Sequence, residues 1–189
     1  MKKVCVFTGA ATGHDPVYKD TAYHLGTMIA ARGLGLVYGG GKMGLMGIVA
    51  DGAIDNAGHV TGIIPRFLDD VEIGHEGVTN LQIIDTMHER KELMYQASDA
   101  FVVLPGGLGT LDETMEITTW RQLDLHKKPV ILFNINGYWD HLLAQMAHIT
   151  AQGFMHHSHR DHFVTVKSLD EIADHLDAVA ASTPLEDIS

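Results

Sequence analysis

Short runs that are apolar at every position recur along this chain. Residues 4–7, 101–104 and 130–133 contain only apolar residues, the single cysteine included. Strands of an open parallel sheet show this pattern because helices cover both faces of the sheet, whereas a strand with one face in water alternates apolar and polar residues. The runs therefore favour a parallel sheet between two layers of helices.

Helical segments separate these runs. Strands are expected at residues 3–8, 35–38, 59–64, 80–85, 100–104 and 129–133, and residues 163–166 can add a last one. Helices are expected at 15–33, 45–56, 87–97, 110–123, 139–152 and 168–180. The alternation predicts an α/β fold, a Rossmann-like doubly wound parallel sheet. A length of 189 residues with 46% hydrophobic content suits a single domain, expected at 1–181 with a flexible tail at 182–189.

The charge balance bears on the kind of partner. Thirteen Lys and Arg against 24 Asp and Glu give a formal charge of -11, which disfavours a surface that grips nucleic acid through its phosphates. A single nucleotide can still bind, because local loops can hold what the whole surface repels. Cys5 is the only cysteine, so one chain can build neither a disulfide nor a multi-cysteine metal site, and we interpret Cys5 as a buried structural thiol.

No segment of the sequence suits a membrane. The apolar run at 4–7 is too short for a signal peptide, and no run approaches the roughly 20 apolar residues of a membrane span. We therefore expect a cytosolic protein without a membrane partner.

Three glycine-rich segments, at 8–13, 39–44 and 105–110, each follow an expected strand. In an open parallel sheet the carboxyl ends of the strands line one edge, and ligands bind there at the switch in strand order. Glycine lets the backbone approach an anion, and the start of the following helix favours negative charge. None of the three is a dinucleotide fingerprint or a Walker P-loop. For any single loop, glycines that merely make a tight turn are an equally good explanation.

Glu113 follows the last glycine loop by one helical turn, so its carboxylate should face the ligand edge. Glu116 and Trp120 share its helical face by spacing, and Asp112 points elsewhere. The alternative is a capping box, in which Thr110 and Glu113 only satisfy the helix start. For an isolated match of this pattern, capping is the commoner role.

Arg90 and Lys91 lie in the first turn of the helix expected at 87–97. Basic residues there oppose the helix dipole unless an anion or a carboxylate compensates. Such a local misfit indicates a functional site, although a solvated charge pattern explains it equally well by spacing.

Histidines are densest near residue 160, where His156, His157, His159 and His162 lie close together. They lack the HExxH motif and regular ligand spacing in a helix, so we interpret them as part of a solvent-exposed loop and expect no metal site.

Four segments together resemble one enzyme family. They are Gly-Gly-Gly-Lys-Met-Gly-Leu-Met-Gly at 39–47, Ile-Pro-Arg at 64–66, Met-His-Glu-Arg-Lys at 87–91 and Pro-Gly-Gly-Leu-Gly-Thr-Leu-Asp-Glu at 105–113. In this order they are similar to the LOG family, the cytokinin riboside 5′-monophosphate phosphoribohydrolases that are often labelled lysine decarboxylases. The resemblance runs from residue 4 to about residue 166.

The resemblance implies a homodimer of Rossmann-like subunits that needs no metal or redox cofactor. It implies hydrolysis of a nucleoside 5′-monophosphate, such as AMP or isopentenyl-adenosine monophosphate, to a free purine base and ribose 5-phosphate. Arg90 and Glu113 match the catalytic arginine and glutamate of the family. The matching phosphate-binding loop contains Gly106, Gly107, Gly109 and Thr110, and further ligand-contacting positions are Glu72, Lys91 and Thr119.

Two positions depart from the family pattern. Thr8-Gly9-Ala10-Ala11 stands where many members carry Cys-Gly-Ser-Ser, which removes hydroxyls that could touch the ligand and bears on the preference for base or sugar. Asp112 replaces the commoner glutamate.

Other functional classes compete with this enzyme. A nucleotide or molybdenum-cofactor carrier on the same fold is the main alternative, because glycine loops establish binding and not turnover. A pyridoxal-dependent decarboxylase has less support, because no lysine lies in a recognisable Schiff-base context.

Overall fold

The computed structural model describes residues 1–156 and 163–182, with the side chains of residues 70–72 left out. Of the tail expected at 182–189, only residue 182 is among the described residues. Three of the four clustered histidines, His157, His159 and His162, lie outside them. The domain boundary at residue 181 stays a prediction.

The described residues form one seven-stranded parallel sheet in the order β4-β3-β2-β1-β5-β6-β7. The strands are β1 (Lys3–Phe7), β2 (Gly35–Tyr38), β3 (Val60–Pro65), β4 (Asn80–Ile84), β5 (Ala100–Val103), β6 (Val130–Phe133) and β7 (Val164–Val166). This sheet confirms the predicted α/β fold, including the last strand.

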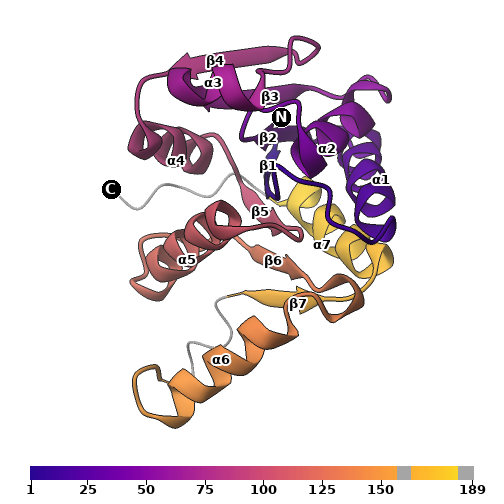
Figure 1. The fold of residues 1–189 in the computed structure, drawn as a ribbon. Coiled ribbons are helices and arrows are strands. Elements are labelled where there is room, and N and C mark those ends of the chain that lie inside the picture. Colours follow the sequence, from indigo (N-terminus) through magenta and orange to yellow (C-terminus); the bar gives the residue numbers. More distant parts are fainter. Residues whose placement is uncertain (157–162, 183–189) are drawn as a thin grey trace.

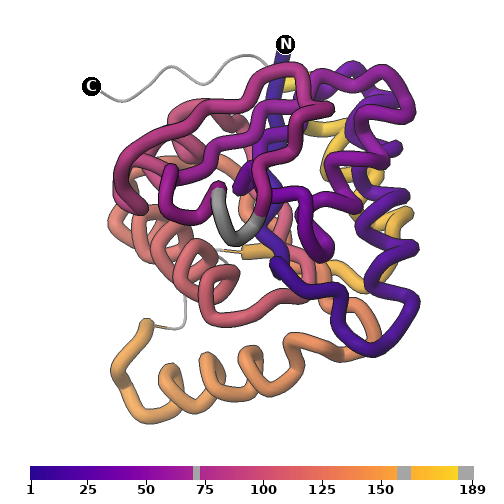
Figure 2. The backbone as a smooth tube through the Cα atoms, turned by 45° about the horizontal axis from the view of Figure 1, so that its top comes forward, coloured from indigo at the N-terminus to yellow at the C-terminus, as the bar shows by residue number. Residues whose placement is uncertain are grey.

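Helices cover both faces of the sheet (Figure 1). One layer holds α1 (Val17–Ala31), α2 (Gly44–Ile54) and α7 (Leu169–Ala181), and the other holds α4 (Met87–Gln96), α5 (Leu108–Gln122) and α6 (Asp140–Ala151). In Figures 1 and 2, α1 and α2 lie side by side. Successive strand residues point to opposite faces, so that Val4 and Val6 belong to one core cluster and Cys5 and Phe7 to the other. Both faces of the strand are therefore buried, as its uninterrupted apolar run predicts.

Two short elements are not among the expected ones. Helix α3 (Arg66–Glu72) follows β3, and the 3-10 helix η1 (Ile135–Gly137) follows β6. Two turns or fewer are too short to display a helical period in the sequence. In the described part of the chain, no helix combines the length and apolar character needed to cross a membrane.

The strand order creates a switch point beside β1. The chain builds β2, β3 and β4 outward on one side of β1, and then returns to place β5 against the other side. The loops that follow β1 and β5 leave the sheet side by side. Ligands bind at such a position in open α/β sheets, so the topology predicts a ligand site at these two loops.

Candidate active site

Hydrogen bonds hold the loops after β1 and β5 together. The N–H of Gly9 donates to the carbonyl oxygen of Pro105 at 3.1 Å, and the Thr8 hydroxyl donates to the same oxygen at 3.1 Å. Two of the three predicted glycine loops thus form one wall at the switch point. The third, after β2, contributes through Gly39.

A cavity of about 210 Å³ opens beside this wall. It contains the predicted catalytic pair together with most of the predicted phosphate loop. Its lining residues are Thr8, Gly9, Ala10, Met46, Arg90, Gly107, Gly109, Thr110 and Glu113. Residues that lie far apart in the sequence therefore meet in one space, which we call the inner cavity.

Arg90 reaches the inner cavity from α4 and is 6% exposed. Its Nε donates to the Ile63 carbonyl oxygen at 3.2 Å, and its Nη2 donates to the Gly39 carbonyl oxygen at 2.9 Å. A Cβ atom at residue 39 would lie 2.0 Å from Nη2, so any other residue there would displace the guanidinium. Because both acceptors are neutral carbonyls, they fix the guanidinium without cancelling its charge, which can act on an anion in the cavity.

Glu113 enters from α5 and is 8% exposed. Helix α5 begins at Leu108, two residues earlier than expected, with Gly107 at its N-cap and no side-chain cap. Thr110 thus lies inside the first turn, and the capping-box explanation of Thr110 and Glu113 is wrong.

A T-x-x-E helix cap of this region is in α4. The Thr86 hydroxyl accepts from the Glu89 N–H at 3.1 Å, and a carboxylate oxygen of Glu89 accepts from the Asp85 N–H at 3.3 Å. The same T-x-x-E pattern therefore caps α4 at Thr86, whereas at Thr110 it places Glu113 in the inner cavity.

The negative charge of Glu113 affects the pKa of the buried Cys5 thiol. Cys5 is fully buried, and burial raises the pKa of its thiol well above the usual range, with a further contribution from the negative charge of Glu113. The thiol therefore stays protonated and unreactive, as expected for a structural cysteine.

The start of α5 offers a binding surface for an anion. The N–H of Leu111 is the first to bond within the helix, to the Gly107 carbonyl oxygen at 3.1 Å, so the N–H groups of the first turn point out of the helix end. A Cβ atom added at Gly107 or Gly109 would meet nothing within 4 Å, whereas one at Gly106 would lie 2.0 Å from the Thr110 hydroxyl. Gly107 and Gly109 thus border open space, and Gly106 is needed for packing.

Lys91 lies outside the inner cavity. Its Nζ is 3.2 Å from Asp112 Oδ2 and 3.0 Å from Glu116 Oε2. Partial burial disfavours the charged form, but the hydrogen bonds and charges of these two carboxylates outweigh it and raise the pKa of Lys91. The carboxylates also compensate for a basic residue near the start of α4.

Of the other predicted ligand-contacting residues, neither is seen to line the inner cavity. Thr119 is exposed, and its hydroxyl donates to the Met115 carbonyl oxygen at 2.7 Å. Glu72 ends α3, but its side chain lies outside the described residues. Glu116 and Trp120 border a separate hollow of about 470 Å³ between α4 and α5.

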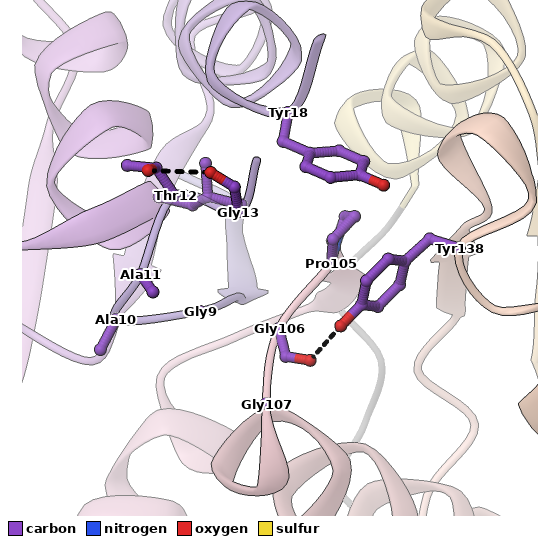
Figure 3. Close-up of a pocket in the computed structure, with 11 residues that line it drawn as sticks. Gly9, Ala10, Ala11, Thr12, Gly13, Tyr18, Pro105, Gly106, Gly107 and Tyr138 are labelled. Carbon is purple, nitrogen blue, oxygen red and sulfur yellow. Dashed lines mark hydrogen bonds between the residues drawn. The ribbon is translucent and has the colours of Figure 1, made fainter. Parts of the chain in front are cut away.

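A second opening adjoins the inner cavity and shares Gly9, Ala10 and Gly107 with it. This outer cleft measures about 470 Å³ and is shown in Figure 3. Besides the two loops it is lined by Leu45 and by Tyr18 and Tyr138. Tyr138 was not expected from the sequence, which offers only a glycine before it as a sign of a turn.

Metal ligands do not gather in the described residues. No group of three or more His, Cys, Asp or Glu side chains there could hold a metal ion. Because three of the four clustered histidines lie outside the described residues, the expectation of no metal site stays a prediction.

Comparison with known proteins identifies the family of the chain. A family model described as "possible lysine decarboxylase" matches residues 46–176. The chain is 47% identical over 165 residues to LOGL9 of Oryza sativa subsp. japonica, a probable cytokinin riboside 5′-monophosphate phosphoribohydrolase, covering 87% of this chain and 73% of that protein. It is 42% identical over 177 residues to the cytokinin riboside 5′-monophosphate phosphoribohydrolase LOG1 of Arabidopsis thaliana, covering 94% and 83%.

Solved structures share the fold at lower identity. The molybdenum cofactor binding protein of Rippkaea orientalis has a TM-score of 0.72 at 23% identity, covering 95% of this chain and 98% of that one. The molybdenum cofactor carrier protein of Chlamydomonas reinhardtii has a TM-score of 0.72 at 19% identity, covering 96% and 99%. At this identity the likeness shows the fold alone, whereas the family model and the more similar relatives show that this chain belongs to the LOG family.

Proposed function

We propose that the chain hydrolyses the N-glycosidic bond of a nucleoside 5′-monophosphate and releases a free purine base and ribose 5-phosphate. The observation that carries the proposal is the buried pair of Arg90 and Glu113 in one cavity with the open start of α5. The names of the relatives, phosphoribohydrolases of cytokinin riboside 5′-monophosphates, support it. A carrier needs the anion site, but it has no use for a buried carboxylate beside it.

The chemistry needs a carboxylate near the anomeric carbon. As the bond from C1′ to the base nitrogen breaks, its electron pair leaves with the base and positive charge develops on the ribose. Glu113 can stabilise this charge, accept the proton of the attacking water, or do both. The water oxygen bonds to C1′, and a proton reaches the departing base. No metal or redox cofactor enters this scheme.

Binding of the phosphate would place the ribose for this step. The first-turn N–H groups of α5 and the Thr110 hydroxyl form the anion site, and Arg90 supplies a full charge nearby. We favour Arg90 over Lys91 because Lys91 is engaged by Asp112 and Glu116 outside the inner cavity. Remote binding of this kind lowers the barrier by fixing the geometry of the reacting centre.

Comparison of adenosine, AMP and ATP tests the role of the phosphate. Adenosine lacks the phosphate and loses one or two charge-assisted hydrogen bonds of roughly 1.5 to 3 kcal/mol each, so kcat/KM should fall at least about tenfold and up to a hundredfold or more. ATP should also be poor, because a site built for one phosphate leaves two others without partners. Chromatography of released adenine measures all three. Equal efficiency with adenosine and AMP would show that the glycine loop is structural.

Glu113→Gln tests the carboxylate. The substitution removes the charge and keeps the shape, so the variant should keep its fold and AMP binding but lose most turnover, on the order of a hundredfold or more. Asp112→Asn is the matched control, because Asp112 is adjacent to Glu113 in the sequence but its own side chain is exposed and turned toward Lys91. A parental rate of AMP hydrolysis in Glu113→Gln would refute the assigned role.

The physiological base is part of the proposal. The relatives act on cytokinin nucleotides by name, and we extend this to isopentenyl-adenosine monophosphate alongside AMP. A panel of monophosphates, compared by base release, decides between them.

We also propose that the chain forms a homodimer and that it is located in the cytosol. The hollow between α4 and α5 presents Tyr95, Trp120 and Leu125 at the surface, and such a face suits a second copy. Sedimentation should give twice the chain mass of 20.6 kDa. A monomer at micromolar concentration would count against the dimer, and cell fractionation tests the location.

A further inference from the structure

Tyr138 reaches from the segment between β6 and α6 to the anion-binding loop. Its hydroxyl donates to the Gly106 carbonyl oxygen at 2.7 Å, as Figure 3 shows. Gly106 directly precedes Gly107, the N-cap of α5. A side chain more than thirty residues away along the chain thus holds the peptide group from which the anion site begins.

The position of Tyr138 is fixed by a tight turn. The buried Asn134 accepts from the Trp139 N–H at 2.7 Å and donates to Asp140 at 2.7 Å. Gly137 has φ of +73°, and a Cβ atom there would lie 2.6 Å from the Asp140 carboxylate. The ring of Tyr138 packs edge to face on Trp139 with a centroid distance of 4.7 Å. The hydroxyl is therefore held in place before it meets the loop.

A hydrogen bond to a carbonyl oxygen also orients the N–H on the same peptide. In a trans peptide the two groups point in opposite directions, so the N–H of Gly107 faces away from Tyr138. Figure 3 shows Gly9 and Ala10 on that other side of the loop, and these residues border both the inner cavity and the outer cleft. Gly106 and Gly107 have no side chains of their own to restrain this peptide.

We propose that Tyr138 is a positioning residue that holds the Gly106–Gly107 peptide in the orientation that binds the 5′-phosphate. The inference rests on the proposed function, because it assigns the loop to a phosphate. Tyr138 does not touch the reacting atoms. It acts equally on bound substrate and transition state, so its loss should raise KM and leave kcat nearly unchanged.

Tyr138→Phe is the test, because it removes only the hydroxyl. Loss of one neutral hydrogen bond corresponds to a KM for AMP about two- to tenfold higher, with kcat within about twofold. Inorganic phosphate, used as a competitive inhibitor, should weaken by the same factor. Hydrogen exchange of the amides in residues 104–111, measured without ligand, should become faster.

Tyr23→Phe is the matched control. Tyr23 lies on α1 and is exposed to nearly the same degree as Tyr138, 37% against 40%, and its hydroxyl donates to the carboxylate of Asp55, at the end of α2, at 3.0 Å. The control also removes a single tyrosine hydroxyl and its hydrogen bond, here one to a carboxylate away from the loop, and should leave all three readouts unchanged.

The readouts separate the two ideas. If the parent hydrolyses AMP and the two variants behave alike, or if Tyr138→Phe lowers kcat with KM unchanged, the positioning role is overturned and the proposed function stands. If the parent neither binds nor hydrolyses any monophosphate, the proposed function fails and takes the phosphate role with it. The exchange rates then still decide whether Tyr138 fixes the loop.

Discussion

Gly109→Ala should stabilise the protein and weaken its activity. Gly109 lies in the first turn of α5, and a Cβ atom there would meet nothing within 4 Å. Alanine is favoured over glycine in a helix by about 0.5 to 1 kcal/mol. In a chain of this size, 1 kcal/mol shifts Tm by about 2 to 4 °C, so Tm should rise by about 1 to 4 °C.

The added methyl group would occupy space in the proposed phosphate site, because Gly109 lines the inner cavity. Placing a methyl group in a filled site costs about 1 to 3 kcal/mol, which corresponds to a loss of about 5- to 150-fold in kcat/KM. A rise in stability with a fall in activity cannot be explained by partial unfolding. Adenine release and thermal unfolding measure the two effects on the same sample.

Gly106→Ala provides the contrast. Its Cβ atom would lie 2.0 Å from the Thr110 hydroxyl and 2.9 Å from the Gly9 nitrogen, so this variant should lower both Tm and activity. If Gly109→Ala hydrolyses AMP with the parental kcat/KM, the first turn of α5 does not hold the phosphate. If the Tm of Gly109→Ala falls instead, a Cβ atom at residue 109 does not lie in open space.

Two further predictions concern buried charged or titratable groups. Arg90→Ala should abolish most AMP hydrolysis and lower the free energy of unfolding by at least about 2 kcal/mol, because two buried carbonyl oxygens lose a charged donor; unchanged activity and affinity would place Arg90 outside the site. Burial lowers the pKa of His126, whose ring nitrogens bond the Ile117 carbonyl oxygen and the Lys128 N–H. The unfolded chain therefore takes up a proton below about pH 6.5 that the folded protein resists, and the free energy of unfolding falls with decreasing pH by up to about 1.4 kcal/mol per unit. Denaturant titrations between pH 7.5 and about 5.5 measure the free energy of unfolding, which should change less with pH in His126→Gln than in the parent. The same pH dependence in both proteins would contradict this origin.

The sequence by itself determined the layers of this fold. Strands such as β1 and β6 follow from the uninterrupted apolar runs at 4–7 and 130–133, because each side chain of these runs is buried on one face or the other. The direction of Glu113 also follows from local geometry, because Cα–Cβ bonds in a helix tilt toward the helix start and Glu113 lies in the first two turns of α5. These features depend on neighbours only a few residues away.

Other local patterns were ambiguous. The T-x-x-E pattern occurs at Thr86 and at Thr110, and only the first caps a helix. Gly107 starts α5 without a side chain that signals a cap. Arg90 and Lys91 are adjacent, yet the rotation of about 100° between successive helical residues sends one into the inner cavity and the other to Asp112 and Glu116.

Only the tertiary structure decided which residues share a site. The return of the chain to place β5 beside β1 brings Pro105 against Thr8 and Gly9, and the same strand order carries Arg90 to Glu113. Tyr138 meets Gly106 from a third part of the chain. Such meetings depend on how whole strands and helices pack, and this order is set by the burial of the entire sheet rather than by any short segment.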